Sequence, residues 1–222
     1  EGTDHVVKVL PGQPRAFELE VPADPSQAAF WVVAACVVPG SEVTVVRVYT
    51  GAARRGFLDV LKRMGARLEE VPATRPGDLA STADVVARSG PLVATEVDAH
   101  EIPGLDEVPV LAVAAARAEG TTVFRGVGEL RVKESDRLRG VVEMVRAFGA
   151  GAEAAGDDLF VTGVPTLSAG HVDARGDHRI AMAAAVAAAS VSGRPTRIVG
   201  WEAVKTSYPG FLEHLAQLTE GR

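Results

Sequence analysis

Three stretches of the chain are apolar at almost every position. They are residues 27–38 (QAAFWVVAACVV), 108–118 (VPVLAVAAARA) and 180–191 (IAMAAAVAAASV). A helix that is hydrophobic around nearly its whole circumference is buried on all sides. We therefore predict three buried helices at the centre of the fold.

A second set of helices has one apolar face and one polar face. The pattern predicts them for residues 57–64, 138–148 and 211–218. Lys62, Arg63, Glu143 and Arg146 fall on the polar sides, as expected for helices that border solvent. Gly65 and Gly149 follow two of these helices and are predicted to end them as C-cap glycines.

The strands predicted between the helices are short and half polar, at residues 43–48, 158–163 and 196–201. Half-polar strands have one face toward water, whereas the apolar helices need cover on every side. The fold class that follows is an inverted α/β domain, with parallel buried helices inside and sheets outside. Parallel helices would direct several N-termini to one face of the domain and concentrate positive potential there.

The order of these elements repeats three times. Each unit has an acidic residue, an apolar helix, a glycine, a strand, a cationic turn and an amphipathic helix. The acidic residues are Asp24, Asp106 and Asp177, and the glycines are Gly40, Gly120 and Gly193. Self-similarity over a long period marks supersecondary units that bury apolar faces against one another. We predict three interlocking repeats; the alternative is chance resemblance among Ala- and Val-rich segments.

Composition limits the possible classes of protein. A chain of 222 residues can form one large or two small domains. The interlocking repeats and the lack of a Ser/Pro-rich linker favour a single domain, residues 1–222. Hydrophobic residues make up 47% but aromatic residues only 5%, so the predicted core consists mainly of Ala, Val and Leu.

Several functional classes are disfavoured. The apolar runs are about a dozen residues long, whereas a membrane-spanning helix needs roughly 20. The net charge of −6 argues against a nucleic-acid-binding surface. Cys36 is the single cysteine, so no disulfide framework is possible and a reducing, cytoplasmic location is expected. No spacing of His, Cys and carboxylate residues resembles a metal site.

The most informative segment is residues 131–137, RVKESDR, directly before an amphipathic helix. Such charge runs are usually solvated helix faces. The start of a helix, however, has unpaired N–H groups and a positive dipole end that attract anions. Cations crowded there oppose the dipole unless an anion is present. The segment therefore suggests an anionic ligand.

Three separate motifs carry a resemblance to a known family. The strings RVKESDRLRG, GDHRIAMAAA and AVKTSYPGFLEHL resemble 5-enolpyruvylshikimate-3-phosphate synthase, and the similarity extends from VPADPSQAAFW to the final helix. Members of this family have two similar domains, each of three βαβαββ units, with the active site between them. The resemblance implies that this chain is one such domain without the N-terminal half. The strand-like residues 4–10 at its start agree with that interpretation.

The resemblance also implies a reaction. The enolpyruvyl group of phosphoenolpyruvate would pass to the 5-hydroxyl of shikimate 3-phosphate, with release of phosphate through a tetrahedral intermediate. This chemistry needs a base, an acid and cations for two anionic substrates. No metal or other cofactor is implied. The expected partners are the two substrates and the missing N-terminal domain, without which the chain is expected to be inactive.

Two acidic residues match the family's proton-transfer groups. Asp106 matches the proposed base and a contact to shikimate 3-phosphate. Glu134 matches the proposed proton donor to the methylene carbon, with Lys205 as a possible partner in that role. Asp106 also has a simpler interpretation as the N-cap of the helix near Val108.

The cations match the anion-binding groups. Arg137 and Arg179 match the pair that holds the phosphoenolpyruvate carboxylate, which suits the planar guanidinium fork. Lys205 matches a phosphoenolpyruvate phosphate ligand, and Lys133 a contact to shikimate 3-phosphate. Glu129 occupies another shikimate 3-phosphate contact position, where some members have Asn. We expect the four cations to converge where the buried helices begin.

Neighbouring polar residues have structural interpretations. Asp24 is predicted to cap the first buried helix, and Asp136 to pair with a nearby arginine. His178 lies beside Arg179 in sequence and either lines the pocket or is structural. The sequence Gly51-Ala-Ala-Arg54 departs from the family's usual Asn-Pro-Thr-Arg, which affects the first loop rather than the site.

Two other functions remain open from the sequence. A sister enzyme that transfers enolpyruvyl to UDP-N-acetylglucosamine shares the fold, although the KESDR and DHRIAM strings favour the shikimate enzyme. A non-catalytic anion-binding domain would not need the acid–base pair Asp106 and Glu134.

Overall fold

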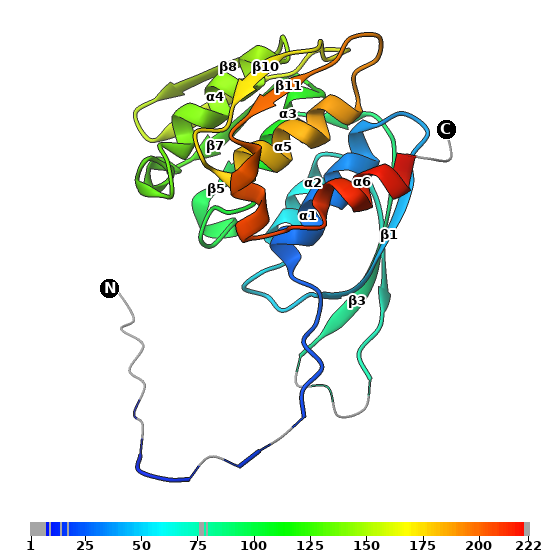
Figure 1. The fold of residues 1–222 in the computed structure, drawn as a ribbon, viewed down its shortest axis with the longest axis vertical. Helices are drawn as coiled ribbons and strands as arrows, with labels where there is room; N and C mark the ends of the chain where they lie inside the picture. The colour runs from blue at the N-terminus through cyan, green and yellow to red at the C-terminus, as the bar shows by residue number, and fades with distance from the viewer. Residues whose placement is uncertain are drawn as a thin grey trace.

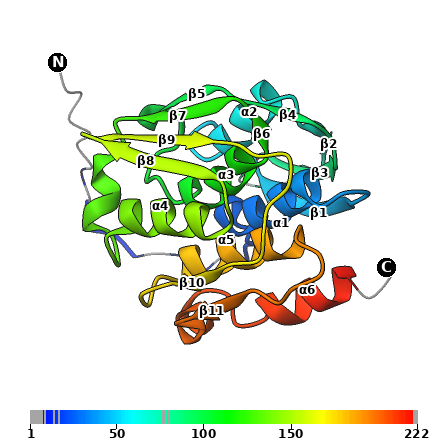
Figure 2. The same ribbon diagram turned by 90° about the horizontal axis from the view of Figure 1, so that it is seen from above.

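The computed structural model is an α/β fold with three apolar helices inside and with sheets and amphipathic helices around them (Figures 1 and 2). It describes residues 8, 10–13, 15–16, 18–75, 78 and 80–219. Three buried helices pack against one another at the centre: α1 (Pro25–Val37), α3 (Val108–Ala116) and α5 (His178–Ala189). Their positions agree with the three predicted helices to within a few residues.

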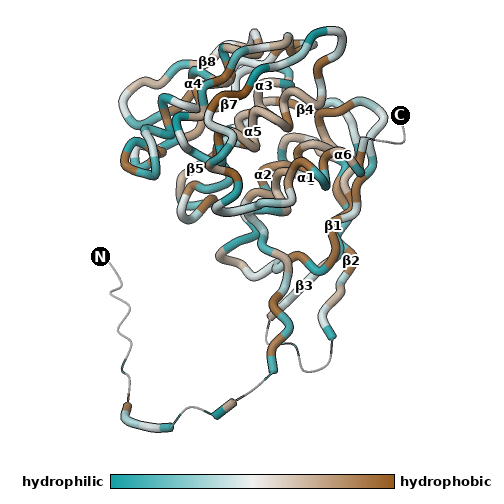
Figure 3. The backbone as a smooth tube through the Cα atoms, viewed as in Figure 1, coloured by the Kyte–Doolittle hydropathy of each residue, from teal (hydrophilic) through white to brown (hydrophobic). Residues whose placement is uncertain are grey.

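The burial of these helices follows from their composition. Every residue of α3 and every residue of α1 except Gln27 is buried. Figure 3 shows apolar residues along α1 and hydrophilic ones gathered in the outer turns. A helix without a polar face is stable in water only when other elements cover it completely. The surrounding sheets and amphipathic helices supply that cover.

In the first unit, a three-stranded antiparallel sheet packs against α1. Its further elements are β1 (Glu42–Tyr49), α2 (Gly56–Arg63), β2 (Arg67–Pro72) and β3 (Thr82–Arg88). The strand order is β1-β3-β2. Ala23, just before α1, forms a parallel bridge to Val48 and adds the chain entering α1 to this sheet.

In the second unit, the four-stranded sheet β5-β7-β9-β8 packs against α3. Its elements are β5 (Glu96–Asp98), the 3-10 helix η1 (Ala99–Glu101), β7 (Thr121–Arg125), the 3-10 helix η2 (Gly128–Val132), α4 (Arg137–Ala147), β8 (Gly151–Ala155) and β9 (Asp158–Thr162). A short parallel pair, β4 (Leu92–Val93) with β6 (Ala118–Glu119), borders the first unit.

The third unit follows the same order through its amphipathic helix. It contains β10 (His171–Asp173), α5, β11 (Arg197–Val199), the 3-10 helix η3 (Trp201–Thr206) and α6 (Phe211–Thr219). In each unit, the strand after the buried helix pairs in parallel with the chain before it. The predicted threefold repeat of these elements is confirmed. In the described part of the chain, the third sheet consists of β10 and β11.

Two predicted helix ends are confirmed by their backbone conformation. Gly65 and Gly149 follow α2 and α4, and both have φ of +86°. Residues with a side chain rarely adopt this left-handed conformation, so glycine ends both helices at little cost. The strand-like residues 4–10 fall mostly outside the described residues. None of the described helices is long and apolar enough to cross a membrane.

The close contact between α2 and η1 leads to a stability prediction. A methyl group added at Gly56, the first residue of α2, would lie 1.6 Å from the carbonyl oxygen of Glu101. Gly56→Ala is expected to lower the free energy of unfolding by roughly 1–3 kcal/mol, as overpacking usually does. Urea-induced unfolding of both proteins measures the difference.

Gly210→Ala is the matched control. The added methyl group there would be no closer than 3.7 Å to another residue, the ring of His214. Equal unfolding midpoints for the two variants would show that α2 and η1 can move apart without loss of stability, which would contradict the close contact at Gly56.

Candidate active site

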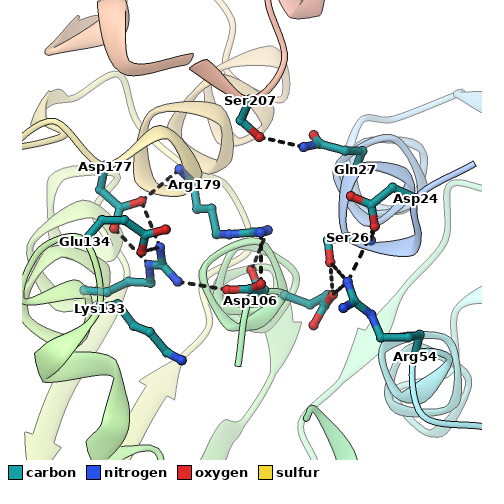
Figure 4. Close-up of polar contacts among 12 residues, drawn as sticks. Asp24, Ser26, Gln27, Arg54, Asp106, Lys133, Glu134, Asp177, Arg179 and Ser207 are labelled. Carbon is teal, nitrogen blue, oxygen red and sulfur yellow. Dashed lines mark hydrogen bonds and ion pairs between the residues drawn. The ribbon is translucent and has the colours of Figure 1, made fainter. Parts of the chain in front are cut away.

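The N-termini of the three buried helices meet at one end of the domain (Figure 4). Ser26 of α1 bonds Glu107 at the start of α3, and Arg137 joins Asp106 near α3 to Asp177 at the start of α5. Each helix start has unpaired N–H groups and a partial positive charge. Acidic side chains at this end of the domain are therefore favoured.

Arg137 is the centre of this polar cluster. It is the first residue of α4, and its side chain is 0% exposed. Its Nε donates to Asp177 Oδ2 at 2.9 Å, its Nη1 to Asp106 Oδ1 at 3.1 Å, and its Nη2 to Glu134. A planar guanidinium can donate in several fixed directions at once, which a lysine ammonium cannot. The side chain thus connects three carboxylates from different elements.

Asp177 is the buried partner of Arg137. It caps α5 by accepting from the backbone N–H of Arg179 at 2.9 Å, and it also accepts from Ser135 Oγ at 3.1 Å. Burial by itself would raise the pKa of Asp177. The hydrogen bond and charge of Arg137, together with the backbone bond, outweigh burial and hold the pKa below its usual value.

Arg179 approaches the same carboxylate as Arg137. Its Nη2 donates to Asp106 Oδ2 at 3.0 Å, and its Nη1 lies 3.4 Å from the Asp106 carbonyl oxygen. The Arg179 side chain is 11% exposed, and its Nε is buried with no hydrogen-bond partner among the described residues. A buried guanidinium N–H without a partner is costly, so this donor is unsatisfied among the described residues.

The two predicted arginines are therefore brought together, but the lysines are placed differently. Lys133 follows η2 and lies on the same side as Glu134 (Figure 4). Its ammonium group donates to Glu129. Lys205 is exposed on η3, which packs against α5. Within the described part of the chain, no bond joins Lys205 to the Arg137 cluster, which consists of Arg137, Asp106, Glu134 and Asp177.

The interpretation of Asp106 as a helix cap is wrong. The N-cap position of α3 belongs to Glu107, and both Asp106 carboxylate oxygens accept from arginines. Asp24 does cap α1, accepting from the N–H of Ser26 at 3.0 Å, as predicted. Asp136 caps α4 by accepting from the backbone N–H of Arg139. The pKa of the Arg139 side chain is raised mainly by Glu143 and more weakly by the charge of Asp136, the neighbouring acidic residue.

The loop before α3 explains why Asp106 does not cap. Gly104 and Leu105 have φ of +85° and +59°, and Asp106 follows them one residue before the N-cap. A leucine in the left-handed region costs about 1–2 kcal/mol. In the first and third units the acidic residue occupies the N-cap itself and bonds the backbone. The shift by one residue in the second unit frees the Asp106 carboxylate for side-chain partners.

A second cluster, which we call the Ser26–Arg54–Glu107 cluster, was not predicted from the sequence. Ser26 Oγ donates to Glu107 Oε1 at 2.5 Å, and Arg54 Nη2 lies 2.6 Å from Ser26 Oγ and 3.9 Å from Glu107 Oε1. Burial raises the pKa of Glu107, opposed by Ser26 and Arg54. The sequence did contain one signal for this cluster, the cationic turn that precedes each amphipathic helix. Arg54 precedes α2 much as Arg137 begins α4, so Arg54 could have been expected to pair with acidic residues at the helix starts.

The remaining candidates border this end of the domain. Burial and then the positive charge of Arg179 lower the pKa of the half-buried His178. The side chains of Glu134 and Glu129 are 52% and 63% exposed. Glu129 also lines a shallow hollow of about 430 Å³, together with Gly104 and Leu105, the two residues before Asp106. The hollow thus lies beside the loop that holds Asp106.

A metal site is not formed by the part of the chain that the structure describes. No group of three or more His, Cys, Asp or Glu side chains there is arranged to hold an ion. The charges at the helix starts are instead those of arginine and carboxylate side chains.

Two solved structures that share this architecture are named as an EPSP synthase and an enolpyruvyl transferase. EPSP synthase from Acinetobacter baumannii superposes with a TM-score of 0.82 and 35% identity, over 90% of this chain and 46% of that one. The enolpyruvyl transferase NikO from Streptomyces tendae has a TM-score of 0.65 at 21% identity, which supports the shared fold alone.

Sequence comparison identifies the family more narrowly. The family model for EPSP synthase (3-phosphoshikimate 1-carboxyvinyltransferase) matches residues 1–215, and the chain belongs to that family. It is 46% identical to the 3-phosphoshikimate 1-carboxyvinyltransferase of Herpetosiphon aurantiacus over 221 residues, and 47% identical to that of a Synechococcus strain over 201 residues. These alignments cover 98% and 89% of this chain but 51% and 45% of the relatives. The chain thus spans about half the length of the curated relatives it matches.

Proposed function

We propose that this chain forms one side of an active site that transfers enolpyruvyl from phosphoenolpyruvate to the 5-hydroxyl of shikimate 3-phosphate. The observation that supports this most directly is the pair Arg137 and Arg179, which both bond Asp106 at the meeting point of the helix starts. The pair lies within the motifs that resemble the family. Phosphoenolpyruvate carries a carboxylate and a phosphate, and both suit arginine and helix N-termini.

The carboxylate of phosphoenolpyruvate would bind Arg137 and Arg179 by taking the place of Asp106 on their terminal nitrogens. The Nε of Arg179 is buried without a partner among the described residues, and it would gain one only if the ligand displaced the groups that cover it. Arg137 is held in place by Asp177 on its buried side, so its orientation is fixed before the ligand arrives. Preorganised donors lower the cost of binding a charged group. Lys205, exposed on η3, would contact the phosphate.

Asp106 would act as the base. It would take the proton of the 5-hydroxyl as the oxygen bonds to carbon 2 of phosphoenolpyruvate. Glu134, with Lys205 as a possible partner, would deliver a proton to the methylene carbon at the same stage. Glu134, left as a carboxylate by that transfer, would then take a proton back from the same carbon as phosphate departs, which restores the double bond. Asp106 and Glu134 both contact Arg137, which keeps the two proton-transfer groups close together.

Shikimate 3-phosphate would bind on the side of Lys133 and Glu129. Lys133 carries the charge that an anionic substrate needs, and its present partner is the exposed Glu129 carboxylate. An exposed ion pair contributes about 0–1 kcal/mol, so a phosphate or carboxylate can displace Glu129 at little cost. Glu129 would then contact a hydroxyl group of the substrate from the edge of the hollow.

The other side of the active site would come from a partner domain. The relatives are about twice as long as this chain, and their additional half is the candidate partner. We place the reaction in the cytoplasm, where the lone buried Cys36 would remain reduced.

The isolated chain is expected to fold but not to catalyse. With one side of the site open, water remains around the substrates and neither is positioned against the other. The measurement is phosphate release in the presence of both substrates. It is made with this chain alone and with this chain combined with the other half of the longer relatives, the half that this chain does not match. We call that combination the complete enzyme.

Rapid turnover by the chain alone would contradict the two-sided site. No turnover by the complete enzyme would contradict the proposed function itself. UDP-N-acetylglucosamine in place of shikimate 3-phosphate serves as the control acceptor and is expected to give no phosphate release.

A further inference from the structure

Asp106 and Glu107 are consecutive acidic residues whose side chains bond different units of the fold. The Asp106 carboxylate bonds Arg137 and Arg179, which belong to the second and third units. The Glu107 carboxylate bonds Ser26 and lies near Arg54, both in the first unit. The start of α3 is therefore fixed on both sides by side chains from its neighbours.

The Glu107 side is the more deeply buried of the two. Glu107 is 5% exposed as a residue, whereas the Asp106 side chain is 29% exposed. A buried carboxylate is costly unless it is hydrogen-bonded and paired, and both conditions are met here. Its neighbour Ser26 is also buried, and Arg54 is the one member of the cluster that extends into solvent. Moving Glu107 would break the bond to Ser26 and separate the charge from Arg54.

The loop on the other side of Asp106 cannot hold it alone. Gly104 and Leu105 both have positive φ, and Leu105 is strained in that conformation. Such strain persists only where the surroundings determine the backbone on both sides. The buried Leu105 side chain anchors the loop before Asp106, and Glu107 anchors the backbone after it. Without Glu107, the loop can relax and carry Asp106 with it.

A comparison of the units supports a role beyond packing. Arg54 reaches Asp24 at the start of α1 and Glu107 at the start of α3. Arg137 likewise reaches Asp106 and Asp177, at the starts of α3 and α5. The two arginines occupy corresponding places in consecutive units, and the proposed catalytic residue is positioned between them.

From this geometry we infer that Glu107 is a positioning residue for Asp106, acting through the Ser26–Arg54–Glu107 cluster. The inference rests on the proposed function, in which Asp106 is the base. Glu107 is buried and would touch no substrate. It fixes the backbone from which the Asp106 carboxylate projects, and a general base displaced by about 1 Å can lose roughly 10²-fold in rate.

The test is a double-mutant cycle in the complete enzyme. Glu107→Ala is expected to lower kcat by roughly 10- to 100-fold while KM for each substrate changes little. Glu107→Gln, which keeps an oxygen to accept from Ser26 Oγ, is expected to recover most of the rate. The combination of Glu107→Ala with Asp106→Asn is expected to be no slower than Asp106→Asn alone, because a displaced base and an absent base are equivalent.

Two further variants complete the test. Ser26→Ala serves as the substitute test if Glu107→Ala fails to fold. It removes only the hydroxyl that Glu107 and Arg54 share, and it is expected to lower kcat by a smaller factor than Glu107→Ala. Glu70→Ala is the matched control, because the Glu70 side chain is 15% exposed and paired with Arg55 and Lys62 in the same unit. Its kcat is expected to match that of the unsubstituted enzyme.

The outcomes separate this inference from the proposed function. No transfer by the unsubstituted complete enzyme overturns both. Transfer with normal kcat in Glu107→Ala overturns the positioning role alone. The positioning role is also overturned if the fold-loss in kcat of the double variant equals the product of the two single fold-losses. Such independence would show that Glu107 does not act through Asp106.

Discussion

Arg137→Ala is expected to destabilise the chain by about 3–5 kcal/mol, the usual cost of removing one partner of a buried ion pair. Asp177 would remain with a side chain 0% exposed and without its guanidinium partner. A loss of this size is a large part of the stability of an ordinary domain. Urea-induced unfolding of the chain at neutral pH measures it.

The control for this prediction lies two residues further along the same helix. Arg139 is 60% exposed, and its partner is the exposed Glu143. Arg139→Ala is expected to change stability by no more than about 1 kcal/mol. If the two variants unfold at the same urea concentration, the Arg137 cluster contributes no more than a surface pair.

The difference between wild type and Arg137→Ala should depend on pH. Arg137 holds the pKa of Asp177 below its ordinary value in the folded state, against the effect of burial. A carboxyl with a lowered folded pKa contributes stability above its unfolded pKa and loses it as pH falls through the folded pKa. The stability gap is therefore expected to be widest at neutral pH and to narrow on acidification. A gap that widens in acid would contradict the pairing.

Asp106→Asn is expected to lower the rate of the complete enzyme by roughly 10²-fold or more, the scale of a lost general base. Stability should change by only about 1 kcal/mol, because asparagine keeps an oxygen that can accept from an arginine and Arg137 keeps its bonds to Asp177 and Glu134. Steady-state phosphate release and thermal unfolding of the same preparations measure the two effects.

Asp136→Asn is the matched control for Asp106→Asn. Asp136 caps α4 immediately before Arg137, and asparagine caps a helix about as well as aspartate. We expect near-normal rate and stability. Lost stability with normal turnover per folded molecule in Asp106→Asn would make Asp106 a structural residue.

The helices were predictable because their signal is local. An apolar run such as residues 108–118 indicates burial whatever surrounds it, and the glycines that follow α2 and α4 indicate where those helices end. The order of elements in the three units followed from the same local patterns. The predicted helix boundaries therefore differ from the observed ones by only a few residues.

The site was predictable only in part, because its bonds join distant segments. The resemblance named Arg137, Arg179 and Asp106, and the helix-start pattern predicted that the arginines converge. The pairing of Arg137 with Asp177 spans 40 residues, and that of Ser26 with Glu107 spans 81. Periodicity contains no information about such pairs. The cap assignment of Asp106 failed because the left-handed backbone at Leu105 shifts the helix start by one residue.

The arginine bridges between consecutive helix starts affect how this fold can be recombined. Arg54 belongs to the first unit but forms a 3.9 Å ion pair with Glu107 of the second, and Arg137 belongs to the second but bonds Asp177 of the third. A chimera that exchanges the second unit between two relatives thus replaces Glu107 and Arg137 but keeps Arg54 and Asp177. Such a graft is expected to fold only when the incoming unit offers the same charges at both junctions, so those junctions, rather than the sheets, determine which sequences can be combined.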